Sequence, residues 1–101
     1  MSGLVTLLPS IAIAQTYDGS TSACRQEFSD SRITVTENAI KFYESMCEVK
    51  SAKKDQGGMY YLSMNCNGEG EEWELEARLQ FLNDGKLFLE TDGYARDYVQ
   101  C

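Results

Sequence analysis

The sequence predicts an all-β protein: a single small antiparallel meander, closed into a barrel or folded into a sandwich and held by two disulfides. Three observations lead to this prediction. Residues 73–81 alternate strictly between apolar and polar side chains, Asp-Gly pairs separate strand-like runs, and four cysteines occur in 101 residues. Alternation with a period of two places one face of a strand on a core and the other in water.

The second half of the chain shows the strand pattern most clearly. Residues 73–81 read WELEARLQF, with an apolar side chain at each odd position. Asp84-Gly85 leads into a second strand-like run at 87–91, and Asp92-Gly93 turns the chain again into residues 94–101. Asp-Gly between two strand-like runs is a strong hairpin signal. We therefore expect three consecutive antiparallel strands here.

The first half also shows strand-like runs separated by turns, but its turn signals are weaker. We expect strands at 32–36, 40–50 and 59–66, a turn at 37–38, a polar loop at 50–58 and a tight turn at 67–70. A helix is compatible with the sequence only at 20–30, with Ser22 as its cap. Six or so strands with short connections favour an up-and-down order.

Residues 1–14 have the features of a truncated signal peptide. The apolar run LVTLLPSIAI ends in Ala12-Ile13-Ala14, small residues of the kind that signal peptidases read, although the first basic residue is Arg25. We expect a single β domain at 15–101 and a periplasmic or secreted location, the alternative being a tail on a cytosolic protein. Since a membrane helix needs roughly 20 apolar residues, no membrane span is expected.

An even number of cysteines in so short an exported chain predicts a disulfide framework. The cysteines are Cys24, Cys47, Cys66 and Cys101. They are widely spaced and the chain has no histidine, so a zinc site is not expected. Of the three pairings we favour Cys24–Cys47, which would flank the first hairpin, with Cys66–Cys101, which would tie down the end of the chain.

Composition narrows the function classes. A net charge of −7 repels nucleic acid and would attract a basic partner. The alternative is that the charge only keeps the protein in solution. Without histidine or a G-x-S-x-G, phosphate-loop or dinucleotide motif, no catalytic site and no cofactor are expected. Carboxylates such as Glu69 and Glu71 would support hydrolysis only if a cleft exists. In Asn65–Glu72 we favour a solvated turn over a calcium loop, so no metal is expected.

Two resemblances add to this. The segments IKFYESMC at 40–47, CNGEGEEW at 66–73 and YVQC at 98–101 resemble small exported proteins of alphaproteobacteria, which are largely uncharacterised. This similarity covers most of residues 15–101 and implies location and fold rather than an activity. Residues 57–61, GGMYY, resemble the Ser-Gly-x-x-Tyr segment that periplasmic C-type lysozyme inhibitors, which are small β-barrels, insert into the lysozyme cleft. Gly58 and Tyr61 match this segment, and Gly57 replaces its serine.

Together these observations predict a secreted or periplasmic domain that binds rather than catalyses, as an inhibitor of a basic secreted enzyme such as lysozyme. Its expected contact is the loop at 50–58 with Gly57, Gly58, Tyr60 and Tyr61. Because Tyr60 and Tyr61 are adjacent, they should face opposite sides of a strand. The alternative is a structural or stress-related protein of the cell envelope with no small ligand. The sequence leaves the oligomeric state open.

Overall fold

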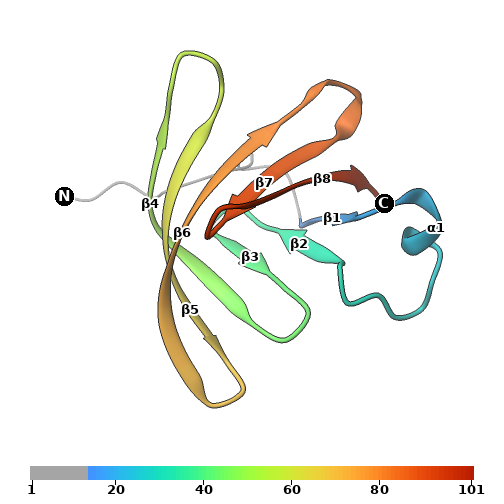
Figure 1. Ribbon diagram of the computed structural model, residues 1–101, viewed down its shortest axis with the longest axis horizontal. Coiled ribbons are helices and arrows are strands. Elements are labelled where there is room, and N and C mark those ends of the chain that lie inside the picture. The colour runs from blue at the N-terminus through green and yellow to red at the C-terminus, as the bar shows by residue number, and fades with distance from the viewer. Residues whose placement is uncertain (1–13) are drawn as a thin grey trace.

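Eight antiparallel strands, each hydrogen-bonded to the next along the chain, close into a barrel in the computed structural model (Figure 1). The structure describes residues 14–101, so the predicted signal peptide lies outside them except for Ala14. The prediction of an all-β antiparallel meander with two disulfides is confirmed, in its barrel form. The strands are β1 (Gln15–Asp18), β2 (Ile33–Val35), β3 (Ala39–Lys41), β4 (Met46–Lys54), β5 (Tyr60–Gly68), β6 (Glu71–Phe81), β7 (Leu87–Thr91) and β8 (Tyr94–Gln100).

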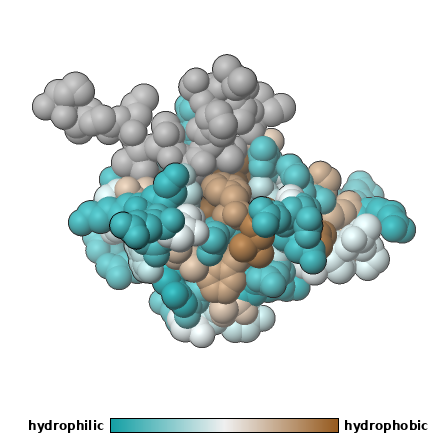
Figure 2. All heavy atoms as spheres, turned by 90° about the horizontal axis from the view of Figure 1, so that it is seen from above, coloured by the Kyte–Doolittle hydropathy of each residue, from teal (hydrophilic) through white to brown (hydrophobic). Residues whose placement is uncertain are grey.

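The core consists of the inward-facing residues of every strand, as the alternation predicts. In β6, Ala77 and Leu79 are buried, while Glu74 and Glu76 face outward and are exposed. Figure 2 shows the end of the molecule that carries the β4–β5 hairpin, where hydrophilic side chains flank a band of hydrophobic ones. The buried cluster is Tyr17, Ile33, Val35, Ile40, Cys47, Leu62, Met64, Cys66, Ala77, Leu79, Leu87, Leu89 and Tyr98.

The turns form where the sequence supplies residues that tolerate positive φ. Glu69 and Gly70 have φ of 52° and 81° and join β5 to β6, so the predicted turn at 67–70 occupies only its last two residues. The predicted Asp-Gly turns are also confirmed. Asp84-Gly85 lies in the short 3-10 helix η1 (Asn83–Gly85) between β6 and β7, and Asp92-Gly93 joins β7 to β8.

Two predicted boundaries are wrong. The expected strand at 40–50 is divided by a turn at 42–45, where the Phe42 amide donates to the Ser45 carbonyl at 2.8 Å. The expected loop at 50–58 is β-strand as far as Lys54. An irregularity between Val49 and Ser51 lets β4 keep its pairing with β5 along this polar stretch. The β4–β5 hairpin therefore extends beyond the barrel (Figure 1).

The favoured disulfide pairing is also wrong: the bonds are Cys24–Cys101 and Cys47–Cys66. Cys47 and Cys66 are directly opposite each other in β4 and β5, with Cα atoms 4.0 Å apart. The register of the β4–β5 hairpin, with its irregularity between Val49 and Ser51, brings the two cysteines opposite each other. Cys24 ends the short helix α1 (Thr21–Cys24), which lies between β1 and β2.

Helix α1 lies inside the range in which the sequence allowed a helix, but its cap is Ser20 rather than Ser22. The Ala23 amide donates to Ser20 Oγ at 3.1 Å, which satisfies one of the free amides at the start of the helix. Within residues 14–101, no helix has the length and apolar character needed to cross a membrane.

Candidate functional site

The predicted contact loop is a rigid tip on the protruding β4–β5 hairpin. Asp55 organises it, because its Oδ1 accepts hydrogen bonds from the backbone amides of Gly57 at 2.9 Å and Met59 at 3.0 Å. The Asp55 amide donates to the Met59 carbonyl at 3.0 Å, which closes the turn. Gly58 has a φ of +95°, a conformation that side chains rarely adopt. The tip is therefore fixed before any partner arrives.

Two side chains, one from β5 and one from β6, brace this tip. Tyr61 Oη donates to Asp55 Oδ2 at 3.3 Å, and Gln80 Nε2 donates to the Gly57 carbonyl at 3.0 Å. The hydrogen bond from the Met59 amide, together with those from Gly57 and Tyr61, holds the pKa of Asp55 below its ordinary value. Asp55 is thus a charged acceptor at neutral pH, and its charge strengthens each of these bonds.

Tyr60 and Tyr61 lie on opposite sides of β5, as expected. Tyr61 faces outward opposite Lys53 and is 47% exposed. Tyr60 faces inward and packs edge-on against Phe81, with ring centroids 6.2 Å apart. The Lys54 ammonium lies 5.7 Å from the centre of the Tyr60 ring. Of the four predicted contact residues, Gly57 and Tyr61 are therefore open to a partner, whereas Gly58 and Tyr60 mainly shape the hairpin.

A second surface, which the sequence did not single out as a site, lies on the outward faces of β4, β5 and β6. The register places Glu48 opposite Asn65, Asn65 opposite Glu74, and Asn67 opposite Glu72. The strands enclose a shallow depression here, which we call the acidic hollow. It is lined by Glu48, Asn65, Cys66, Asn67, Glu72, Trp73 and Glu74.

The acidic hollow carries negative charge on its outward-facing side chains. Trp73, between Glu72 and Glu74, belongs to the inward-facing set of β6 and is 39% exposed near the end of the strand. Glu74 Oε2 lies 3.2 Å from Lys50 Nζ, and this is the one ion pair that involves a carboxylate of the hollow among residues 14–101. An exposed pair of this kind is weak, so it neutralises the hollow only in part. The hollow thus offers carboxylate and amide acceptors to a positively charged group.

Two further carboxylates meet where the turn at 42–45 approaches the end of the β5–β6 hairpin, and we call this pair, Glu44 and Glu69, the acidic tip. The hydrogen bond that protonated Glu44 can donate to Glu69, together with the repulsion between the two charges, raises the pKa of Glu44. Gly68 fits against the backbone of Glu44 with no room for a side chain, which explains the close approach of the two turns. The acidic tip and the β4–β5 tip mark opposite ends of the long hairpins (Figure 1).

These carboxylates do not form a metal cage in the part of the chain that the structure describes. Within residues 14–101, no group of three or more cysteine or carboxylate side chains is arranged to hold a metal ion. Glu72 and Glu74 both lie on the exposed outward face of β6, and the hollow beside them is shallow and open.

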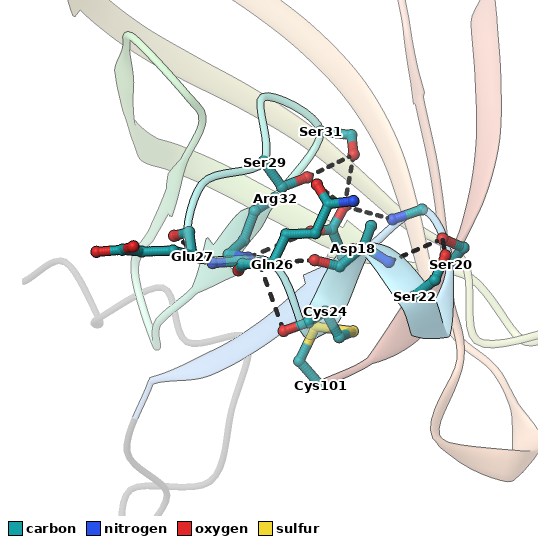
Figure 3. Close-up of polar contacts among 12 residues, drawn as sticks. Asp18, Ser20, Ser22, Cys24, Gln26, Glu27, Ser29, Ser31, Arg32 and Cys101 are labelled. Carbon is teal, nitrogen blue, oxygen red and sulfur yellow. Dashed lines mark hydrogen bonds and ion pairs between the residues drawn. A yellow bond between two sulfur atoms is a disulfide. The ribbon is translucent and has the colours of Figure 1, made fainter.

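A third cluster, absent from the sequence-based expectations, surrounds the fully buried carboxylate of Asp18 (Figure 3). Its Oδ1 accepts from the Gly19 amide at 2.7 Å, from Ser29 Oγ at 3.1 Å and from Ser31 Oγ. Its Oδ2 lies 3.2 Å from Arg32 Nε. Burial by itself would raise the pKa of Asp18, but these hydrogen bonds together lower it below its ordinary value.

Arg32 extends this cluster into the connection between β1 and β2. Its Nη2 donates to the carbonyl oxygens of Ala23 at 2.8 Å and Gln26 at 2.6 Å. The connection thereby gains a fixed shape, and it presents Phe28 with 79% of its surface exposed. The only local hint in the sequence is the group of hydroxyl residues that precedes Arg32, and it does not reveal that Asp18 is their partner.

Comparison of the chain with protein-family models, with curated proteins and with solved structures finds no match. The two resemblances that the sequence suggests therefore stay predictions. The β4–β5 tip and the acidic hollow are the two surfaces whose geometry and charge bear on function.

Proposed function

We propose that the protein is an exported binding domain without catalytic activity, and that its partner is a basic protein such as a secreted lysozyme, which it inhibits. The observation that supports this most directly is the acidic hollow with its neighbouring acidic tip. Both lie on the long β4–β5–β6 part of the sheet in a chain of net charge −7. A field of one sign attracts an oppositely charged protein over several ångströms and raises its association rate.

Short-range chemistry in the hollow favours an arginine or lysine side chain of the partner. The carboxylates of Glu48 and Glu72 accept charge-assisted hydrogen bonds from a cationic side chain. Arginine fits best, because its planar guanidinium bonds a carboxylate with two parallel hydrogen bonds.

The β4–β5 tip would supply the specific contact with the enzyme. It protrudes, it is braced by Tyr61 and Gln80, and Gly57 leaves its outer surface free of a side chain. A loop that is already ordered loses little conformational entropy on binding, which favours affinity. Lys53 and Lys54 flank this tip and would oppose a basic partner, so the attraction comes from the hollow and the fit from the tip.

The test is a titration of the oxidised full-length chain against a panel of basic lysozymes, following both binding heat and lytic activity at low and physiological salt. We expect saturable inhibition that persists at physiological salt. The double change Glu72→Gln and Glu74→Gln should weaken binding by about tenfold or more, and Tyr61→Ala should reduce inhibition. Asp97→Asn, a charge change on the outward face of β8, is the matched control and should have no effect.

Two results would contradict the proposal. If binding disappears as salt rises, or if no lysozyme binds, the acidity serves solubility and the alternative role in the cell envelope gains support. If binding persists but the Glu72→Gln, Glu74→Gln variant binds like the parent protein, the acidic hollow is not the contact surface.

A further inference from the structure

The two disulfides lie in very different surroundings. Cys47 and Cys66 are 1% and 2% exposed and belong to the hydrophobic core. Cys101 is exposed, and Cys24 is partly exposed at the end of α1. Exchange of a disulfide requires that a thiolate reach one of its sulfur atoms. An external thiol can therefore approach Cys24–Cys101 in the folded protein, whereas the barrel must open before it reaches Cys47–Cys66.

The accessible bond spans the seam at which the barrel closes. Across this seam β1 pairs with β8 through Tyr17 with Gln100 and Asp18 with Val99. The Cys101 amide also donates to the Thr16 carbonyl at 2.8 Å. The pairing of β2 with β3 is equally short, whereas β4, β5 and β6 are joined by long ladders, with β5 and β6 paired along the whole of β5. The seam is thus a short ladder reinforced by a covalent bond, which lies beside the Asp18 cluster (Figure 3).

We propose that Cys24–Cys101 is a reducible latch, which a dithiol opens while Cys47–Cys66 stays oxidised. A thiolate of the dithiol attacks Sγ of Cys101, and Cys24 leaves as a thiolate that takes up a proton. The second thiol of the reductant attacks this mixed disulfide and releases Cys101 as a thiol. The dithiol supplies two electrons and two protons and ends as a disulfide.

Opening the latch loosens the seam and leaves the rest of the barrel paired. Once the bond is broken, β8 is held to β1 by its short ladder alone, so the two strands separate more often and expose their edges. Strands β4, β5 and β6 keep their long ladders and their buried disulfide. Reduction therefore acts on one side of the barrel and spares the acidic hollow.

The test is stepwise reduction of the full-length oxidised chain with dithiothreitol under native conditions, followed by rapid alkylation and peptide mass spectrometry. We expect Cys24 and Cys101 to become labelled together at least tenfold faster than Cys47 and Cys66, so that a form with two thiols accumulates. Hydrogen exchange of that form should rise in β1 and β8 and stay unchanged in β4, β5 and β6. The variant C24S/C101S should reproduce the same exchange pattern without any reductant.

Each other outcome overturns the proposal. Simultaneous labelling of all four cysteines means that reduction requires global unfolding. Earlier labelling of Cys47 and Cys66 means that burial does not protect them. A form with two thiols whose β1 and β8 amides exchange as in the oxidised protein means that the bond does not hold the seam, and a uniform rise in exchange means that its loss unfolds the barrel.

Discussion

Arg32 Nε lies 3.2 Å from Asp18 Oδ2, and this ion pair joins the end of β1 to the connection that follows it. Asp18 is fully buried and Arg32 only partly so. The carboxylate also accepts hydrogen bonds from the Gly19 amide and from the hydroxyl groups of Ser29 and Ser31. Each of its hydrogen-bond partners is therefore a donor. Removing the carboxylate would leave these donors facing each other with no acceptor.

Replacing Asp18 by alanine should therefore destabilise the protein strongly. We expect the free energy of unfolding to fall by about 3 kcal/mol, because Arg32 and several neutral donors lose their buried partner. Urea unfolding followed by tryptophan fluorescence measures this loss. Asp97→Asn, at an exposed position of β8, is the control and should change the value by less than about 0.5 kcal/mol. An equal effect of both changes would mean that the Asp18 cluster adds nothing to stability.

The same carboxylate should make the fold sensitive to acid. The pKa of Asp18 is lower in the folded protein than its ordinary value of 3.8, so the folded state binds its proton less tightly than the unfolded state does. The stability it contributes is complete above pH 3.8 and is lost as the pH falls towards its folded pKa. Urea unfolding at a series of pH values from 7 to 2.5 should show this decline. Asp18→Asn should flatten it, and an unchanged slope in that variant would assign the decline to other groups.

Glu44 should show the opposite dependence. Its pKa is raised by its hydrogen bond to Glu69 and by the charge there, so the folded state gains stability as the pH falls through the folded pKa of Glu44. Glu44→Gln removes one charge and supplies an amide that can donate to Glu69, so it should raise the melting temperature at pH 7. The gain should vanish at acidic pH, where Glu44 is protonated in the parent protein. A gain of the same size at every pH would show that repulsion with Glu69 is not its cause.

Two adjacent glycines of the β4–β5 tip form a matched pair. At Gly58, a φ of +95° makes any side chain strained, and Gly58→Ala should cost about 1–2 kcal/mol. At Gly57 an added Cβ would meet its nearest neighbour, Asp55 Oδ1, at an ordinary distance of 3.5 Å. Gly57→Ala should therefore change stability by less than about 0.5 kcal/mol. Thermal unfolding of both variants checks this, and equal costs would contradict the described conformation of the tip.

The sequence predicted the strand faces and turns that depend only on residues close together in the chain. The alternation in β6 and the Asp-Gly pairs at 84–85 and 92–93 specify strand faces and turns without reference to the rest of the chain. The turn at 42–45 escaped prediction because it contains no glycine, proline, asparagine or aspartate. The strand character of residues 50–54 escaped prediction because only Ala52 among them packs against the core, and the other four are exposed polar residues that give no burial signal.

The candidate site likewise contains some relationships that the sequence could predict and others that depend on which strands pair. Adjacency in the sequence was enough to place Tyr60 and Tyr61 on opposite sides of β5. The acidic hollow required the register of three strands, because Glu48 and Glu74 meet only through Asn65 between them. The disulfides required knowledge of which strands are neighbours, and the cluster around Asp18 required the folding back of the connection between β1 and β2. None of these relationships has a counterpart in spacing along the chain.

The direct opposition of Cys47 and Cys66 has a consequence for how the chain reaches its oxidised form. A slip of β4 against β5 by one residue would turn Cys47 to the outer face and separate the two sulfur atoms. The same slip would carry Glu48 into the core. Oxidation of this pair therefore captures chains in which β4 and β5 are already aligned and rejects those in which they are not. The bond thus fixes the correct register of these two strands.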